Sequence, residues 1–389
     1  MKKALISLLI CSLLTGCWSS KELGESSFVA AVAIEKEGHL FTPKLQFLQP
    51  VKLEQGATDA HMMIASEGLT HFEAGRVAIK GLHRRLFFSH ARTFIVSTDI
   101  AKEGIFPSLD IVFRDQMFRL TSHLFIADQP STLLALPAPL DPLSGISLAK
   151  GIEAAEDSHQ RAITPTLKEF MEMSYEPGRC AYVIRLKKHS DEDQKEPHVD
   201  LDGTAIIKEG VYVKDINDML ADALRIYRNE AGNDTFTFQV PDQEEWFALE
   251  RLRAKASVQP KIQDNRLVVD ISVSTYANIN EWHSTTDLDE RMFDKIQKGY
   301  ADEVKARMEK LLVKMKEEPV TDILGIGTEV RRRLPVYWEK VQNDWDQAFK
   351  EAKVNIKVET NIENYNLIEN TVIEPNQGLS ERFQFPWVK

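Results

Sequence analysis

The sequence predicts a multidomain α/β protein of mixed α+β character, in which mixed or antiparallel sheets pack against helices in two to three domains. Three observations lead to this class. The apolar stretch 86–97 is typical of a buried strand and runs directly into a helix-start pattern at 99–104. The stretch 266–276 alternates apolar and polar residues, which indicates a strand with one face in water. With 389 residues, the chain is also too long for one domain of about 100–200 residues.

The first predicted element is an N-terminal export signal. Lys2-Lys3 precede an apolar core at 4–14, and the core ends in Leu14-Thr15-Gly16-Cys17, the pattern of a lipobox. At roughly 11 residues the core is shorter than the about 20 residues that cross a bilayer. We therefore predict a lipoprotein signal peptide at 1–16, cleaved between Gly16 and Cys17.

Cys17 is the predicted lipidation site. Its thiol can take a diacylglycerol thioether, with or without a further N-acyl chain, and two acyl chains hold a protein stably at a membrane where one chain does not. We expect no cofactor besides this covalent lipid. Two other interpretations of the segment stay open: an ordinary signal peptide with a cysteine nearby, or an uncleaved N-terminal helix.

Residues 17–26 form a short lipidated neck, and residues 27–187 form the predicted N-terminal α/β domain. Runs of β-branched and small apolar residues predict its strands, and apolar residues at three- or four-residue spacing predict its helices. The helix at 66–82 has these apolar residues roughly on helical spacing: Leu69, Phe72, Val77, Ile79 and Leu82. The predicted elements, in order, are strands 28–35 and 41–47 around a turn at 37–39, helix 66–82, strand 86–97, a helical region 99–115, strand 119–127, helices 131–136 and 166–173, and strand 181–186.

A polar segment follows this domain. The residues from Lys187 to His198 include no apolar side chain that a core could bury, and they mix both signs of charge. We predict an exposed interdomain linker at 188–200.

Residues 201–370 form the predicted C-terminal α/β region, either as one unit or as two subdomains at 201–275 and 276–370. Residues 371–389 are predicted to be a tail. The predicted elements, in order, are a hairpin of 203–208 and 211–213 with a turn at Glu209-Gly210, helix 217–228, strands 235–240, 254–262 and 266–276, helix 289–317, a turn at 325–327, a helical region 328–352 with a break at Pro335, and strand 354–359.

The helix at 289–317 is the longest predicted element. Asp287 with Glu290 three residues later forms a capping-box pattern, and Pro319 ends the helix. Its apolar stripe predicts that one face packs on a sheet while the other meets water. A helix lying on a membrane is the alternative, but its polar face mixes both charges and its apolar face lacks Trp.

Charge and cysteine content exclude several classes of protein. The formal net charge is −11, so nucleic acid is not an expected partner and anionic lipid should repel the body mildly. Cys11 leaves with the signal and Cys17 carries lipid, so Cys180 alone remains and no disulfide framework is expected. A lone cysteine without well-placed histidines or carboxylates does not predict a zinc site, and we expect Cys180 to be a small buried residue.

No known catalytic motif occurs in the sequence. It lacks a Gly-x-Ser-x-Gly elbow, a His-Glu-x-x-His pair, a phosphate loop and a nicotinamide fingerprint. The acidic run Asp191-Glu192-Asp193 lies in the polar segment, where nothing would perturb its pKa values. Seven histidines are scattered singly: His61, His71, His83, His90, His123, His159 and His283. We therefore predict no catalytic residue, no metal site and no enzymatic activity.

Four stretches, in order along the chain, resemble the Ger(x)C family, the lipoprotein subunits of nutrient germinant receptors in spore-forming bacteria. They are the lipobox with Trp18 and Glu22-Leu23; the run from Ser89 to Asp128 with its Phe113-Arg114-Asp115; Asp202-Gly203-Thr204-Ala205; and Asp322 to Gly327 followed by Pro335-Val336-Tyr337-Trp338 and Trp345. Each stretch alone is weak, but the ordered set is specific.

The resemblance implies a multidomain α/β body that is anchored by lipid on the outer face of the inner spore membrane. It implies two integral-membrane partners, the A-type and B-type receptor subunits, and a part in nutrient-triggered germination without catalysis. Two other functions stay open. One is a lipid-anchored solute-binding protein that captures a small molecule for a transporter, although the two halves of the chain do not look alike. The other is a tethered envelope enzyme.

Overall fold

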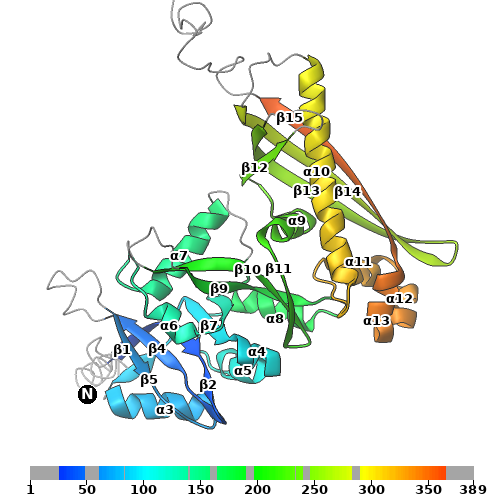
Figure 1. Cartoon of the computed structure of the whole chain (residues 1–389). Helices are drawn as coiled ribbons and strands as arrows, with labels where there is room; N and C mark the ends of the chain where they lie inside the picture. The colour runs from blue at the N-terminus through cyan, green and yellow to red at the C-terminus, as the bar shows by residue number, and fades with distance from the viewer. Residues whose placement is uncertain are drawn as a thin grey trace, which may run out of the picture.

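The structure is a computed structural model that describes residues 26–48, 61–82, 84–138, 141–157, 164–189, 197–232, 234–239, 246–282 and 290–364. Within these ranges the chain forms two lobes, each built on its own sheet (Figure 1). The N-terminal lobe holds the sheet from β1 to β11, and the C-terminal lobe holds the sheet from β12 to β15 together with α9 to α13. The predicted class, mixed sheets packed against helices, is confirmed.

The N-terminal sheet has the order β11-β10-β9-β8-β7-β1-β4-β5, with β6 beside the start of β1. Its central strands β1, β7, β8 and β9 are parallel neighbours, and the strands on either side pair antiparallel. All residues of β7 and β8 are buried, as expected for strands covered on both faces. The strands are β1 (Ser26–Ile34), β4 (Lys44–Leu48), β5 (His61–Ala65), β6 (Arg85–Phe87), β7 (Thr93–Ser97), β8 (His123–Ala127), β9 (Ala181–His189), β10 (His198–Lys208) and β11 (Val211–Ile216). A small hairpin of β2 (Lys36–Glu37) and β3 (Leu40–Phe41) follows β1.

Helices cover both faces of this sheet. One face packs on α6 and α7 through a core that includes Ile95, Phe125 and Ile152, and the other packs on α3, α4, α5 and α8. The helices are α3 (His71–Leu82), α4 (Thr98–Glu103), α5 (Phe106–Arg114), α6 (Pro130–Leu134), α7 (Ser144–Asp157) and α8 (Leu167–Tyr175). Local sequence fixes several helix starts: the Ser97 side chain caps α4, and Thr166 with Glu169 forms a capping box at α8.

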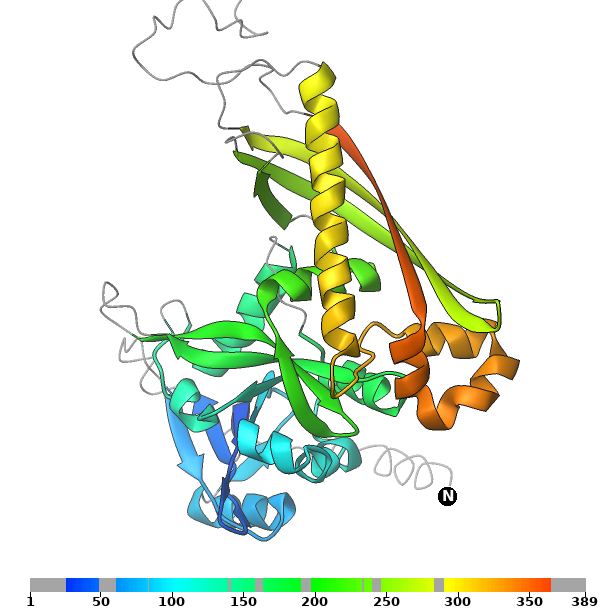
Figure 2. The ribbon, with the colours of Figure 1, turned by 45° about the vertical axis from the view of Figure 1, so that its right-hand side comes forward.

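The C-terminal lobe is a four-stranded sheet, with three long strands and the short β12, and one long helix lies along it (Figure 2). β13 and β14 form a hairpin whose turn, Asp264-Asn265, has φ values of 50° and 62°, as a type I′ turn requires. β15 returns parallel to β14. The strands are β12 (Asp234–Gln239), β13 (Trp246–Gln263), β14 (Arg266–Trp282) and β15 (Lys353–Asn364); the helices are α9 (Asp218–Arg228), α10 (Glu290–Lys316), α11 (Ile326–Arg333), α12 (Pro335–Val341) and α13 (Trp345–Glu351), with a 3₁₀ turn at Gln342–Asp344.

The prediction that the long helix packs on a sheet is confirmed. The apolar stripe of α10, including Ile296, Tyr300 and Val304, is buried, and the Tyr300 ring lies 4.9 Å from the Phe236 ring of β12. The proposed cap Asp287 lies outside the described residues. None of the helices within the described ranges has the length and apolarity that crossing a membrane requires.

The structure contradicts both ends of the predicted linker at 188–200. Lys188 and His189 continue β9, His198 to Asp200 begin β10, and these residues pair with each other in one antiparallel ladder. The described ends of the segment therefore belong to one sheet. The polar and charged side chains of Lys188, His189 and His198 fit the outer end of a two-stranded arm, because such an end meets water on both faces.

The alternative division at 275/276 is also wrong. This position lies inside β14, and β15 pairs with β14 along most of its length. Residues on both sides of 275 therefore share one sheet. No local sequence pattern predicts this pairing, because the helices from α10 to α13 lie between the two strands in the sequence.

Three local predictions also differ from the structure. The expected strand 86–97 is divided into β6 and β7 by a turn in which Ala91 N–H donates to Phe88 O at 2.9 Å. The helix expected from residue 66 begins at His71, because the backbone of Ser66 and Gly68 bonds to Pro43 and Phe41 instead. The helix α7 was not predicted, since its Gly- and Ala-rich sequence has a weak apolar period.

Candidate interaction site

A groove of about 490 Å³ opens on the N-terminal lobe between α3 on one side and α5 with residues 115–118 on the other. The sheet forms its floor through Val32, Ile34 and Leu45. The rest of the lining is His71, Phe72, Gly75, Arg76 and Ile79 of α3; Arg85 to Phe88; Phe94; Ser108, Ile111 and Val112 of α5; and Pro43, Asp115, Met117 and Phe118. Most of these side chains are apolar, so the groove suits an apolar ligand.

The side chain of His71 contributes an imidazole to the lining of the groove. Its ring packs on Phe41 with centroids 4.2 Å apart, and its Nε2 atom is buried without a hydrogen-bond partner among the described residues. Burial lowers the pKa of His71 to about 4, because the charged form loses its hydration. His71 is therefore neutral at neutral pH. The nearby Asp115 carboxylate already accepts a hydrogen bond from Met117 N–H at 2.9 Å.

Large apolar side chains stand exposed beside the groove. The exposed fraction is 56% for Phe72, 43% for Val77 and 37% for Phe87. Leu69, Met117 and Leu120 are exposed in the same part of the lobe. Exposed apolar residues that gather in this way mark an interaction surface more often than isolated ones do.

The two lobes are joined at Asp322, which lies before α11 and is buried. Its carboxylate accepts hydrogen bonds from the backbone N–H groups of Gly325, Ile326 and Gly327 at 2.9, 3.2 and 2.7 Å, and from Trp345 Nε1 at 3.2 Å. Its backbone carbonyl accepts from Cys180 N–H of the N-terminal lobe at 2.8 Å. Burial raises the pKa of Asp322 to about 6, against the lowering effect of these donors.

Close backbone packing completes this joint. A Cβ atom on Gly327 would lie 2.3 Å from the backbone oxygen of Gly178, and one on Gly178 would lie 2.5 Å from the Trp338 ring. Trp338 in turn lies 5.3 Å from the Trp345 ring. The fourth stretch of the family resemblance is thus the part of the chain that closes the joint between the lobes.

Two lysines of the hairpin β10–β11 reinforce the joint. Lys214 Nζ donates to the carbonyls of Lys314, Glu317 and Pro319 at 2.9, 3.0 and 2.8 Å, and so caps the end of α10. Lys208 Nζ donates to Val320 O at 2.8 Å and pairs with Asp346. Cationic groups at a helix C-terminus are favourable because they meet the negative end of the helix dipole.

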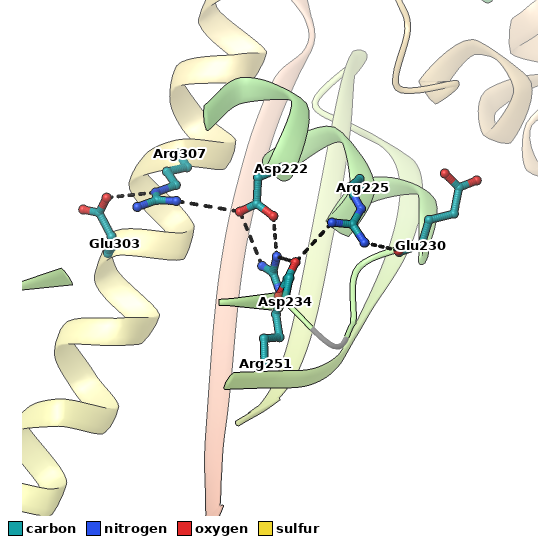
Figure 3. Close-up of polar contacts among 7 residues, drawn as sticks. All are labelled: Asp222, Arg225, Glu230, Asp234, Arg251, Glu303 and Arg307. Carbon is teal, nitrogen blue, oxygen red and sulfur yellow. Dashed lines mark hydrogen bonds and ion pairs between the residues drawn. The ribbon is translucent and has the colours of Figure 1, made fainter. Parts of the chain in front are cut away.

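A buried ionic cluster ties α9 to the C-terminal sheet and to α10 (Figure 3). The Arg251 side chain of β13 is 1% exposed and pairs with both Asp222 of α9 and Asp234 of β12. Around this centre, Arg225 Nη1 lies 3.3 Å from Asp234, Arg307 Nη1 lies 3.8 Å from Asp222, and Arg307 Nε donates to Glu303 at 2.9 Å. The three arginines balance the three carboxylates, so these charges are used to hold the lobe together.

The predicted lipidation and cleavage residues, Cys17 and Gly16, lie outside the described residues. Cys180 is buried, as predicted, and burial raises the pKa of its thiol to about 12. The described parts of the chain contain no group of three or more His, Cys, Asp or Glu residues placed to hold a metal ion. Among the histidines that the structure describes, His71 alone lines the groove.

Sequence reasoning did not find the groove. The apolar residues that it put near helical spacing separate in the structure: Ile79 and Leu82 pack partly against the core, and Leu69, Phe72 and Val77 are exposed. The fully buried residues of α3 are Ala74 and Ala78. The sequence signal that could have revealed the groove is a helix that carries bulky apolar residues although its buried positions are alanines.

Comparisons with known proteins cover both lobes. A family model described as "Spore germination protein N-terminal domain" matches residues 19–188, and one described as "Spore germination B3/ GerAC like, C-terminal" matches residues 202–366. The Putative spore germination protein YfkR of Bacillus subtilis (strain 168) is 23% identical over 385 residues, which is 95% of this chain and 98% of that protein. Spore germination protein KC of the same organism is 22% identical over 395 residues, covering 95% and 97% of the two chains.

A solved crystal structure, that of the GerBC protein, has a similar fold. The TM-score is 0.54 at 16% sequence identity, and the match covers 89% of this chain and 100% of the other. At this identity the likeness shows the fold alone.

Proposed function

The chain belongs to the spore germination GerAC-like family and has a role in spore germination, and we propose that it acts there as a lipid-anchored, non-enzymatic subunit of a nutrient germinant receptor complex. Its partners in this proposal are two integral-membrane subunits of the A and B types. The complex sits at the spore inner membrane, with this chain on the outer face.

The observation that carries the proposal is the match of two family models, one after the other, to nearly the whole chain between residues 19 and 366. The relatives match end to end as well. The lipobox at Leu14 to Cys17 supports the anchor.

Two kinds of observation support a non-enzymatic role. The sequence has none of the catalytic motifs sought, and the conspicuous buried charges have structural partners. Asp322 caps α11 and joins the lobes, and Arg251 is paired with Asp222 and Asp234. A binding role therefore fits the chain better than an acid–base reaction.

A pull-down tests the receptor role. A C-terminally tagged copy is purified from detergent-solubilised spore inner membranes, and the bound proteins are identified. We expect two polytopic membrane proteins in a stable ratio. Recovery of the lipoprotein alone, in a detergent that preserves other membrane complexes, would contradict the proposal.

Fractionation of cysteine variants tests the anchor. Cys17→Ala removes the acceptor of the diacylglycerol, so we expect the protein to leave the membrane fraction. Cys11→Ala is the matched control, because this cysteine precedes the cleavage point and leaves with the signal. Equal membrane retention of the two variants would show that the lipid is not what holds the protein.

The groove favours one alternative function, a lipid-anchored solute-binding protein that serves a transporter. Its volume of about 490 Å³ falls in the range of small-molecule sites, about 300–1,000 Å³. Calorimetric titration of the purified lipoprotein with nutrients separates the two functions. Micromolar binding of a nutrient, together with an empty pull-down, would favour the alternative.

A further inference from the structure

The face of the N-terminal lobe that carries the groove is cationic, although the whole chain is acidic. Arg76, Lys80, Arg84 and Arg85 are exposed, and none of them forms an ion pair with another described residue. Between residues 69 and 92 the only acidic residue is Glu73, whose carboxylate accepts from Leu69 N–H at 2.8 Å. Residues 115–120 add one carboxylate, Asp115, which lines the groove, and one exposed cation, Arg119, so the face keeps an excess of positive charge.

Apolar side chains are interleaved with these cations. The Arg76 guanidinium lies 5.0 Å from the centre of the Phe72 ring, and Phe72 is 56% exposed. Phe87 is exposed and lines the apolar groove between α3 and α5, and Val77 is exposed on another side of α3. Exposed aromatic and aliphatic groups next to arginine and lysine are typical of surfaces that enter the headgroup region of a bilayer.

The chain enters the lobe at this same face. Ser26, Ser27 and Phe28 of β1 pair in parallel with Arg85, Leu86 and Phe87 of β6. Cys17 precedes Ser26 by nine residues, which span at most about 30 Å. A lipid on Cys17 therefore enters a membrane within reach of the face.

The position of the face suits a membrane contact. Figures 1 and 2 both show α3 at the end of the N-terminal lobe that lies farthest from the β12–β15 sheet. A membrane in contact with α3 would leave the C-terminal lobe pointing away from it.

We propose that the face formed by α3, β6 and residues 115–120 docks on the anionic headgroup layer of the membrane that holds the lipid anchor. The unpaired cations meet lipid phosphates, the exposed apolar side chains reach the acyl boundary, and the groove opens toward the lipid. This inference rests on the proposed lipid anchor. It adds a second, electrostatic contact that fixes which side of the body faces the bilayer.

Depth-dependent quenching in vesicles tests the orientation. The full lipidated protein is reconstituted into phosphatidylcholine mixed with phosphatidylglycerol, and a fluorophore is attached to cysteine in Phe72→Cys or Val77→Cys. Val313→Cys and Val336→Cys are matched controls, because these residues of the C-terminal lobe are 60% and 69% exposed. Cys180 is buried and Cys17 carries lipid, so labelling is selective. We expect nitroxide-labelled lipids to quench positions 72 and 77 several-fold more than positions 313 and 336.

Charge reversal tests the chemistry. Arg76→Glu, Arg84→Glu and Arg85→Glu are combined in each labelled variant, with circular dichroism to check folding. Each lysine or arginine near an anionic surface strengthens binding by about fivefold, so the excess quenching at 72 and 77 should disappear. It should also disappear in pure phosphatidylcholine and fall with added salt.

The possible outcomes distinguish a failure of the docking-face proposal from a failure of the lipid-anchor proposal. Vesicle flotation with no excess quenching at 72 and 77 would leave the anchor standing and overturn the docking face. Failure of the wild-type protein to float would overturn both. Equal quenching in pure phosphatidylcholine would overturn the role of anionic lipid. Burial of position 72 only when the membrane subunits are present would also overturn the proposal, and would assign the face to a protein contact.

Discussion

His71 shows how one residue can make stability depend on pH. Its folded-state pKa of about 4 lies below the ordinary value of 6.5, because the ring is buried and Nε2 has no partner among the described residues. Between these two values the unfolded chain binds the proton more strongly than the folded one. The contribution of neutral His71 to the free energy of unfolding is therefore fully present above about pH 6.5, and it is lost as the pH falls toward 4.

Replacement of His71 should remove this pH dependence. The measured quantity is the free energy of unfolding of His71→Phe minus that of the wild type. We expect this difference to be about 3 kcal/mol more favourable to the variant at pH 4 than at pH 7. Urea denaturation at both pH values measures the difference. His90→Phe is the control, because it makes the same replacement at an exposed histidine of the same lobe. Parallel pH profiles for wild type and His71→Phe would contradict the prediction.

Gly327 tests the close approach of the lobes. Its missing side chain allows contact with Gly178, whose backbone oxygen would lie 2.3 Å from an added Cβ. We expect Gly327→Ala to lower the free energy of unfolding by about 1–3 kcal/mol, since the backbones must move apart. The control is Gly151→Ala in α7, where no atom lies within 4 Å of the new Cβ. That change should be neutral or stabilising by up to about 1 kcal/mol. Similar effects in both thermal unfolding curves would count against the steric argument.

At the scale of elements, the buried ionic cluster fixes α9 against β12, β13 and α10. Removal of Arg251 would leave Asp222 and Asp234 buried with fewer positive partners. We expect Arg251→Met to cost about 3–5 kcal/mol, because uncompensated buried charge is strongly unfavourable.

Arg253 is the matched control for this prediction. It lies two residues along the same strand, its side chain is 57% exposed, and it pairs at 3.7 Å with Glu363 on the surface. Arg253→Met should cost at most about 1 kcal/mol in chemical denaturation. Equal costs for the two arginines would show that the cluster adds nothing beyond a surface pair.

The helix α3 shows why element type is easier to predict than element orientation. Its helical period is visible in the sequence, but its exposed and buried faces are not. The sheet accepts the small side chains of Ala74 and Ala78, while Phe72 and Val77 stay exposed. The candidate groove could not be predicted for the same reason, since it depends on which face of α3 meets the sheet.

At the scale of the whole molecule, Asp322 connects the lobes through its side chain and its backbone. Asp322→Ala removes the acceptor of four donors: the backbone N–H groups of Gly325 to Gly327 at the start of α11, and Trp345 Nε1. We expect a loss of several kcal/mol, because buried donors without acceptors cost about 1–3 kcal/mol each. We also expect the C-terminal lobe to unfold in a separate, earlier calorimetric transition.

The control for the joint is Asp110→Ala on α5. Asp110 forms an exposed pair with Arg114 at 2.7 Å, and water screens such a pair, so its loss should leave the transition unshifted. A single unshifted transition for Asp322→Ala would mean that the other contacts between the lobes suffice, among them Lys214 with the end of α10.

The sequence by itself determined the α/β class, the type of most elements and the resemblance to a spore germination family, which the family models confirm. Its lipobox also predicts the anchor at Cys17. These features are local: a period of two or 3.6, a cap, or a short motif leaves its mark on neighbouring residues.

Tertiary structure alone decided which distant segments meet. It joined β9 to β10 across the expected linker, paired β15 with β14, and brought Asp322 to Cys180. It also left a cationic, apolar face on a chain whose net charge is −11. Pairing between strands and the burial of a helix face depend on partners far along the chain, so no local pattern specifies them.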